Sequence, residues 1–208
     1  MGTDKKEVIN VRIIGITGGI GTGKSTVLHI MEQEKGVYIM ETDRLAHTLM
    51  EPGQKAYKKI VEVFGAHILS EDQTIDRANL GKIVFEDADR LEQLNAIVHP
   101  AVKEYIMADI EAKRKSGVVQ FYVIEAALLI EDGYKAICDE LWYIYVDREE
   151  RIRRLVKGRG GDRAKYESVM ENQATEEYYM SNCDVVIHNE ESLEKTANIV
   201  KELLFSAR

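Results

Sequence analysis

The sequence has little of what typifies membrane proteins or secreted, disulfide-bonded proteins. It holds only two cysteines, Cys138 and Cys183, whose spacing matches neither a disulfide framework nor a pair of metal ligands. No uninterrupted apolar run approaches the roughly 18 residues of a membrane span. Residues 1–7 are polar, lack the apolar segment of a signal peptide, and are expected to form a mobile leader. These absences favour a cytoplasmic protein without a membrane partner.

An excess of basic residues is also missing. The chain has 28 Lys and Arg against 36 Asp and Glu, a net charge of −8, which argues against a general nucleic-acid partner. Its 208 residues, 45% hydrophobic and 31% charged, are typical of a globular chain. That length suits one α/β domain with an elaborated insert, or a core with small subdomains.

One segment, residues 18–25, has a strong chemical signature. Its sequence Gly-Gly-Ile-Gly-Thr-Gly-Lys-Ser fits the P-loop pattern of a glycine, four further residues, then Gly-Lys-Ser or Gly-Lys-Thr. The β-branched residues of 11–17 predict a buried strand before it, and the apolar positions of 25–36 predict a helix after it. A strand, a glycine loop and a helix in this order argue against a chance match.

The chemistry of this segment is anion binding. Glycines let backbone N–H groups wrap a phosphate, and the following helix adds the positive end of its dipole. Lys24 would reach the β- and γ-phosphates of a nucleoside triphosphate, and the Ser25 hydroxyl would ligate Mg²⁺. The expected nucleotide-binding residues are Gly18, Gly19, Ile20, Gly21, Thr22, Gly23, Lys24, Ser25 and Thr26.

A carboxylate, Asp43, follows the second predicted strand, residues 37–40. Ligands of open α/β sheets bind beyond the carboxyl ends of the strands, where the P-loop also lies. Asp43 is therefore a candidate base that accepts a proton from an attacking hydroxyl. The spacing leaves equally open that Asp43 is the N-cap of a helix over residues 44–50.

Residues 44–115 have helical periodicity and almost no strand signal. Apolar stripes predict several helices, and Pro100 is expected in the first turn of a further one. We expect this stretch to be a helical acceptor-binding domain. Arg77 and His99 are its candidate substrate-binding residues, with a surface ion pair and a packing histidine as the respective alternatives.

Strand signals return after this helical stretch. A nearly continuous apolar strand over residues 118–124 ends in Glu125, which could orient Mg²⁺ through water. Further strands are expected over residues 141–147 and 184–189, followed by a closing amphipathic helix. The expected nucleotide-binding core comprises residues 1–43, 116–147 and 182–208.

Positive charge gathers in residues 148–165, where eight cations face three carboxylates, a local balance of 8 − 3 = +5. Such a run is usually a solvated helix face. Here the glycines of residues 158–161 make the segment easy to hinge, and an arginine that folds over a triphosphate stabilises the transferring group. We expect residues 148–181 to form an Arg-rich lid and a return helix, with Arg154 and Arg159 as candidates to face the phosphate.

Further short motifs accompany the P-loop along the chain. They are Gly15 to Thr26, Thr42-Asp43, Glu51-Pro52-Gly53, Asp76-Arg77, Val84-Phe85, Val98-His99-Pro100, Leu128 to Glu131, Arg154-Leu155, Arg159, Gln173, Cys183 to Ile187, and Asn189. In this order and spacing they resemble the dephospho-coenzyme A kinase family over residues 12–205. The resemblance implies an α/β fold: a P-loop kinase-like parallel sheet sandwiched by helices, with a helical substrate insert and a lid.

The resemblance also implies an activity, the ATP-dependent phosphorylation of the ribose 3′-hydroxyl of dephospho-coenzyme A. By position it makes Asp43 the base, Lys24 and Arg159 the charge stabilisers, Ser25 the Mg²⁺ ligand and Thr17 an active-site residue. Two alternatives are a nucleoside or nucleotide kinase of similar architecture and a nucleotide switch that hydrolyses GTP. Such switches usually carry an Asn-Lys-x-Asp segment, which this sequence lacks.

The sequence departs from the pattern of the family at three places. Glu41 stands where the family commonly has an aspartate, and Glu125 stands where a later strand commonly ends in aspartate, without the proline that usually follows. The spacing from Arg154 to Arg159 is one residue longer than in the family. This last difference leaves the identity of the lid arginine open between these two.

Overall fold

The computed structural model describes residues 10–206, so the expected leader of residues 1–7 lies outside the described residues. The chain divides into two compact units. One comprises Met1–Met40 and Lys113–Arg208, and the other comprises Glu41–Ala112. In the described part of the chain, no helix combines the length and the apolar character that crossing a bilayer requires.

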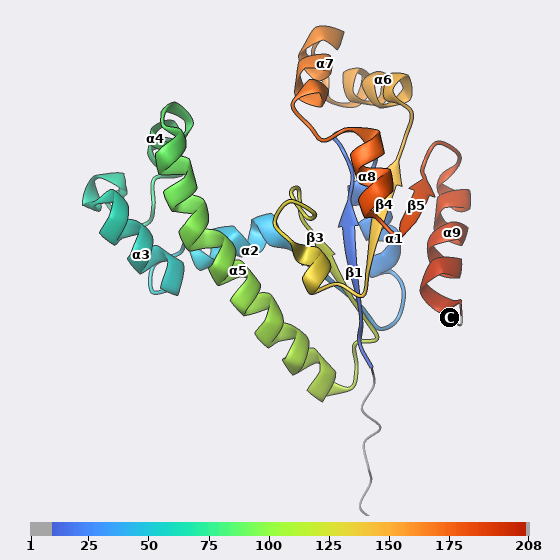
Figure 1. Cartoon of the computed structure of the whole chain (residues 1–208), viewed down its shortest axis with the longest axis horizontal. Coiled ribbons are helices and arrows are strands. Elements are labelled where there is room, and N and C mark those ends of the chain that lie inside the picture. Colours follow the sequence, from blue (N-terminus) through green and yellow to red (C-terminus); the bar gives the residue numbers. More distant parts are fainter. Residues whose placement is uncertain (1–9, 207–208) are drawn as a thin grey trace, which may run out of the picture. The chain divides into compact units, whose positions relative to one another are not determined.

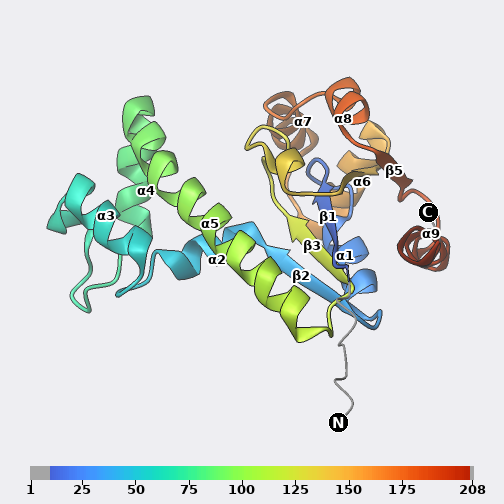
Figure 2. The same cartoon turned by 60° about the horizontal axis from the view of Figure 1, so that its bottom comes forward.

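The first unit is built on a five-stranded parallel sheet with the strand order β2-β3-β1-β4-β5. Figure 1 labels β1, β3, β4 and β5, and Figure 2 labels β2. The strands are β1 Arg12–Thr17, β2 Val37–Glu41, β3 Phe121–Glu125, β4 Glu140–Tyr145 and β5 Val185–His188. The central strand β1 pairs with β3 on one side and with β4 on the other. The predicted α/β fold with a parallel sheet is confirmed.

Two helices, α1 (Lys24–Glu32) and α9 (Leu193–Phe205), pack on one face of this sheet. Because side chains alternate along a strand, Ile14 and Ile16 of β1 point to this face, where they are fully buried with Trp142 of β4. α1 and α9 also contact each other.

The opposite face is covered by the chain between β3 and β4 and by α8 (Glu176–Asn182). Leu129 and Cys138 lie directly over Gly15 of β1, where an added Cβ would meet both side chains. The ring of Tyr179 in α8 stacks on Tyr143 of β4, with 4.8 Å between ring centroids. A short 3-10 helix, η2 (Tyr134–Ala136), lies in the covering segment.

The basic segment forms α6 (Arg148–Arg159) and is followed by α7 (Arg163–Glu171). Two helices, α7 and α8, occupy the end of the segment that was expected to form the lid and its return helix. Thr175 separates them, since its side chain accepts a hydrogen bond from the Tyr178 N–H as the N-cap of α8.

The second unit is helical (Figure 2). Its elements are α2 Thr42–Leu49, α3 Lys55–Phe64, the 3-10 helix η1 Ala66–Ile68, α4 Arg77–Glu86 and most of α5 Ala88–Ser116. Asp76 caps α4 by accepting from the N–H groups of Ala78 and Asn79. Within the unit, Tyr57 of α3 donates a hydrogen bond to the Gln73 carbonyl at 2.5 Å.

The helix start predicted at Pro100 is wrong, because Pro100 lies inside α5, a helix of 29 residues. Proline has no N–H, so the Ala96 carbonyl loses its normal helical donor. The flanking side chains of Val98 and Val102 are buried. We infer that their packing outweighs the local cost of the proline, a tertiary effect that periodicity does not reveal.

Candidate functional site

The phosphate-binding loop, residues 18–25, follows β1 directly and opens α1. Gly18, Gly21 and Gly23 have φ angles of 155°, 81° and 85°. Residues with a Cβ rarely adopt such positive φ values. The glycines of the motif are therefore required by the backbone path that brings the loop to the N-terminus of α1.

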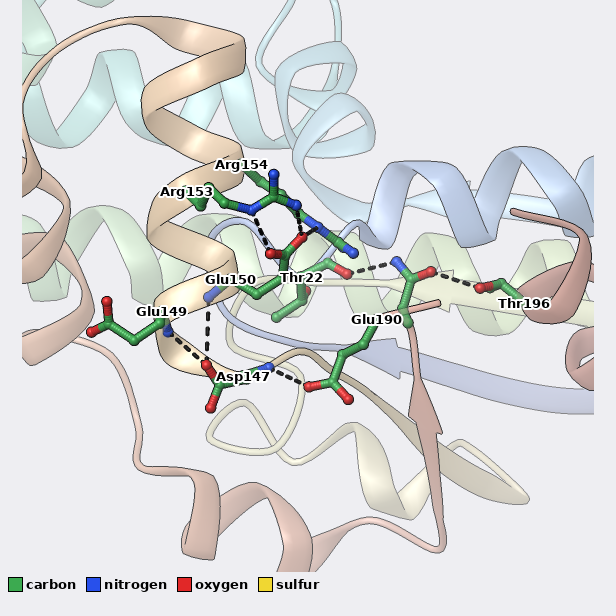
Figure 3. Close-up of polar contacts among 9 residues, drawn as sticks. Thr22, Asp147, Glu149, Glu150, Arg153, Arg154, Glu190 and Thr196 are labelled. Atoms are coloured by element: carbon green, nitrogen blue, oxygen red, sulfur yellow. Dashed lines mark hydrogen bonds and ion pairs between the residues drawn. The ribbon is translucent and has the colours of Figure 1, made fainter. Parts of the chain in front are cut away.

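Contacts from the C-terminal part of the chain hold this loop from behind. The Asn189 side chain donates from Nδ2 to the Thr22 carbonyl at 2.8 Å, and its Oδ1 accepts from Thr196 Oγ1 at 2.8 Å. Figure 3 labels Thr22 and Thr196 at the two ends of these bonds. Thr22 also donates from Oγ1 to the Gly19 carbonyl at 2.9 Å. Asn189 follows β5 and is buried. This residue, one of those that carry the family resemblance, therefore supports the loop structurally.

Lys24 and Glu125 come together beside the loop. In the sheet, Ile16 of β1 pairs with Glu125, the last residue of β3, so this carboxylate lies next to the strand that leads into the loop. Lys24 Nζ donates to the Gly18 carbonyl at 2.6 Å and lies 3.9 Å from Glu125 Oε1. Their side chains are only 20% and 16% exposed, so this charge pair is weakly screened by water.

A pocket of about 860 Å³ opens over the loop, within the range of known ligand sites. Its lining residues all belong to the first unit. They are Gly19, Ile20, Gly21, Gly23, Lys24, Ser25, Thr26, Glu125, Arg154, Leu155, Gly158, Arg159, Val169, Gln173, Asn189, Glu191 and Leu193. Of the nine expected nucleotide-binding residues, Gly18 and Thr22 lie outside the lining. Thr22 is fully buried and stabilises the loop internally.

The two candidate lid arginines both line this pocket but differ in their partners. Arg154 is half-buried, and its Nε donates to Glu150 at 2.8 Å (Figure 3). The same carboxylate accepts two hydrogen bonds of 2.7 Å from Arg153. These bonds, first from Arg153 and then from Arg154, lower the pKa of Glu150 to about 2. Arg159 is exposed and makes no hydrogen bond or ion pair with any residue of the described range 10–206.

Arg151 is a residue of the site that the sequence analysis missed. The sequence pattern placed Arg151 with the other cations of a run that is usually a solvated helix face. In the structure it is only 7% exposed, and its guanidinium contacts the Ile20 carbonyl and the Gln173 side chain. One signal in the sequence points to this position. Arg151 precedes Leu155 by four residues, so both share one face of α6.

The remaining catalytic candidates are Thr17 and Asp43. Thr17 ends β1 immediately before the loop and is 1% exposed. Asp43 lies exposed in the first turn of α2, a helix that begins at Thr42 and has Glu41 as its N-cap residue. The interpretation of Asp43 as an N-cap is therefore wrong, because the helix begins two residues earlier than expected.

The two candidate substrate-binding residues lie in the second unit. Arg77 opens α4, and its Nη2 lies 3.1 Å from Glu51 Oε1 in a half-exposed ion pair. This pair links two of the resembling motifs, Glu51-Pro52-Gly53 and Asp76-Arg77. His99 lies in the middle of α5 and is partly buried.

Known proteins are similar to this chain in sequence and in fold. The model of the dephospho-CoA kinase family matches residues 12–195. The dephospho-CoA kinase of Carboxydothermus hydrogenoformans is 41% identical over 192 residues, 92% of this chain and 92% of its own. The enzyme of that name from Geobacter sulfurreducens is 39% identical over 194 residues, 93% of this chain and 97% of its own.

Solved structures agree. TT1252 from Thermus thermophilus superposes with a TM-score of 0.78 at 28% identity, covering 96% of this chain and 99% of its own. The dephospho-CoA kinase from Campylobacter jejuni, at 23% identity, shares the fold with a TM-score of 0.69 over 92% of this chain and 96% of its own. The family model spans the loop, the helical unit and the lid segment, and the identity to curated relatives extends over nearly the whole length of the chain. The chain therefore belongs to the dephospho-CoA kinase family.

Proposed function

We propose how the residues of this chain perform the reaction of its family. As a member, the chain transfers the γ-phosphoryl group of ATP to the ribose 3′-hydroxyl of dephospho-coenzyme A, which gives coenzyme A and ADP. The observation that carries the assignment of roles is the pocket over residues 18–25, which combines loop glycines, a lysine and two arginines in its lining. The positive groups of such a pocket suit a triphosphate, because they stabilise the negative charge on the phosphoryl group during its transfer.

The phosphates of ATP occupy the loop in this proposal. Backbone N–H groups of the loop and the N-terminus of α1 bind the anion, apart from the Ile20 N–H, which donates to Gln173 Oε1. Lys24, already directed along the loop by its bond to the Gly18 carbonyl, reaches the β- and γ-phosphates. The Glu125 carboxylate lies 3.9 Å from the Lys24 ammonium, and both side chains are only weakly exposed.

The donor set beside the loop fits Mg²⁺. The exposed Ser25 hydroxyl and the Glu125 carboxylate are hard oxygen ligands, and both line the pocket. Ser25 would hold the ion directly and Glu125 would orient it through water. When bound, Mg²⁺ neutralises negative charge on the β- and γ-phosphate oxygens.

Asp43 is the proposed general base. It accepts the proton of the ribose 3′-hydroxyl as the oxygen attacks the γ-phosphorus. It lies exposed in the first turn of α2. Thr17 is proposed as a further active-site residue, at the buried junction of β1 and the loop.

We assign the acceptor to the helical residues 44–115 and the closing of the pocket to a lid, residues 148–181. Arg77 and His99 are the proposed contacts with the acceptor. In the lid, Arg154 and Arg159 supply positive charge to the transferring phosphoryl group, which an arginine can contact bidentately. A cytoplasmic location and the lack of a nucleic-acid partner remain proposals, supported by the net charge of −8 and two free cysteines.

The assignment is tested with purified protein, ATP, Mg²⁺ and dephospho-coenzyme A. Coenzyme A and ADP should appear in equal amounts, and product analysis should place the new phosphate on the 3′-oxygen. Parallel reactions replace the acceptor with a nucleoside monophosphate and ATP with GTP. Turnover of the monophosphate without turnover of dephospho-coenzyme A would support the nucleotide-kinase alternative. Tight GTP binding without transfer to either acceptor would support the switch.

A further inference from the structure

Arg151 stands apart from the other cations of the basic segment. Among the residues that the structure describes, it is the one arginine or lysine that is buried. No carboxylate of residues 10–206 forms an ion pair with it. Burying an unpaired charge costs free energy unless its donors are satisfied. The contacts that satisfy this guanidinium therefore indicate what it is for.

Those contacts close a ring around one residue of the loop. Arg151 Nε donates to the Ile20 carbonyl at 2.9 Å, and Arg151 Nη2 donates to Gln173 Oε1 at 3.3 Å. The same Gln173 oxygen accepts a hydrogen bond from the Ile20 N–H at 2.9 Å. Both backbone groups of Ile20 are thus held, one from α6 and one from the connection between α7 and α8.

Glycines of the loop make room for this arrangement. A Cβ on Gly19 would clash with Arg151 Nη2 and would lie 2.9 Å from Gln173 Oε1. One turn further along α6, Leu155 packs against Gly21, where a Cβ would lie 2.9 Å from Leu155 Cδ1. Helix α6 is therefore docked on the loop at two successive points on one face.

This docking sets the register of the lid arginines. Arg154 lies three residues after Arg151, about one helical turn, and Arg159 lies in the last turn of the same helix. Both line the pocket over the loop. A rotation or shift of α6 would move these guanidinium groups relative to a phosphate bound in the loop.

We propose that Arg151 is a positioning residue for phosphoryl transfer, which with Gln173 clamps Ile20 so that α6 presents its arginines to the bound phosphates in fixed register. The inference rests on the proposed function, because it assumes that Arg154 or Arg159 stabilises the transferring group. A misplacement of about 1 Å at such a group can cost about 10²-fold in rate.

The test compares Arg151→Met, which keeps most of the length and loses the hydrogen bonds, with Arg148→Met as a control. Arg148 lies on the same helix and carries the same charge, but it is half-exposed and contacts Glu167 at 3.5 Å. We expect Arg151→Met to lower kcat about 10- to 100-fold and Arg148→Met to change kcat less than about twofold. If Arg151→Met folds poorly, Gln173→Ala provides the test, because it removes the hydrogen bond from the Ile20 N–H and should lower kcat in the same way.

A double-mutant cycle separates positioning from a general loss of stability. Arg154→Ala or Arg159→Ala, whichever lowers kcat more, is combined with Arg151→Met. If Arg151 acts through that arginine, the double variant loses little more than the larger single loss. Fully additive losses, or a kcat that matches wild type in Arg151→Met, overturn the proposal.

A second measurement does not depend on activity. Amide hydrogen exchange at Ile20 should accelerate at least about tenfold in Arg151→Met and in Gln173→Ala, and should stay unchanged in Arg148→Met. Unchanged exchange at Ile20 in both clamp variants overturns the proposal, even in an active enzyme. If instead the wild-type protein fails to phosphorylate dephospho-coenzyme A while Ile20 exchange responds as expected, the acceptor assignment is wrong and the clamp stands.

Discussion

At the scale of single residues, Asp43 had two candidate roles, general base and helix N-cap, and the structure excludes the second. Since Glu41 and not Asp43 occupies the N-cap position of α2, removing the charge of Asp43 does not change the N-cap residue. We predict that Asp43→Asn lowers kcat by roughly 10²–10⁴-fold, as expected for loss of a general base. ATP affinity and Tm should change little. Near-normal turnover with a clearly lower Tm would contradict the assignment, and steady-state rates with thermal melting decide it.

Lys24 allows a second test at this scale. Lys24→Ala removes the one loop side chain expected to contact the transferred phosphate, and it leaves Glu125 without the ammonium 3.9 Å away. We predict a loss of roughly 10²–10³-fold in kcat, comparable to the loss of an oxyanion-stabilising donor. Rapid-quench measurement of the phosphoryl-transfer step checks this. A change confined to KM for the acceptor would argue against contact with the phosphates.

The lid arginines differ in a way that predicts their order of importance. Arg154 donates a hydrogen bond to Glu150, whereas Arg159 lines the pocket without a partner among residues 10–206. We predict that Arg159→Ala lowers kcat roughly 10³-fold, the lower end for an arginine that stabilises phosphoryl transfer. Arg154→Ala should cost less. The reverse order in parallel assays would identify Arg154 as the phosphate contact.

At the scale of elements, α5 shows how packing overrides a local preference. Pro100 is exposed in the interior of this helix, while its neighbours Val98 and Val102 are buried. We predict that Pro100→Ala raises the free energy of unfolding by up to about 3 kcal/mol, because it restores the missing N–H and removes the ring clash. Denaturant unfolding measures this. A lower stability would show instead that the packing of α5 requires a bend at the proline.

The break between α6 and α7 is instead set by residues close together in the chain. The connection from α6 to α7 passes through Gly160 and Gly161, whose φ angles of 69° and 87° favour glycine. Asp162 then caps α7 by accepting from the Lys165 N–H. These local devices explain why the basic segment breaks into helices at these positions, independently of the sheet below.

At the scale of the whole molecule, two partly buried thiols predict the response of the fold to alkali. Burial, with a smaller effect from the Asp139 charge, raises the pKa of Cys138 from an ordinary 9.0 to about 12. Burial also raises the pKa of Cys183, to about 11. Because these values rise on folding, the neutral thiols contribute stability that is fully present below pH 9 and is lost as pH increases toward 12.

We therefore predict that Cys138→Ala flattens the fall of stability between pH 9 and the raised pKa. In the wild type this thiol alone should contribute a decline of about 1.4 kcal/mol per pH unit in that window. Urea unfolding at a series of pH values measures the difference between the two proteins. Parallel curves for wild type and variant would show that Cys138 ionises equally in the folded and unfolded states.

The sequence by itself determined the features that depend on near neighbours along the chain. The strands around Ile14, Val123 and Ile144 follow from short β-branched and aromatic runs, and the parallel α/β fold follows from their alternation with helices. The loop could be predicted because its glycines and Lys24 form one contiguous motif. Assignment of Asp43 and Arg159 as candidates also came from their positions in the chain, and these roles stay predictions.

Only the tertiary structure decided which distant side chains support the site. Arg151 and Ile20 are 131 positions apart, and Asn189 and Thr22 are 167 apart, so no local periodicity reveals their hydrogen bonds. Burial likewise decided that α5 continues through Pro100 and that one arginine of a charged helix faces inward. The physical reason is that packing and polar satisfaction depend on which surfaces meet after folding, whereas turns, caps and loops depend on the local backbone.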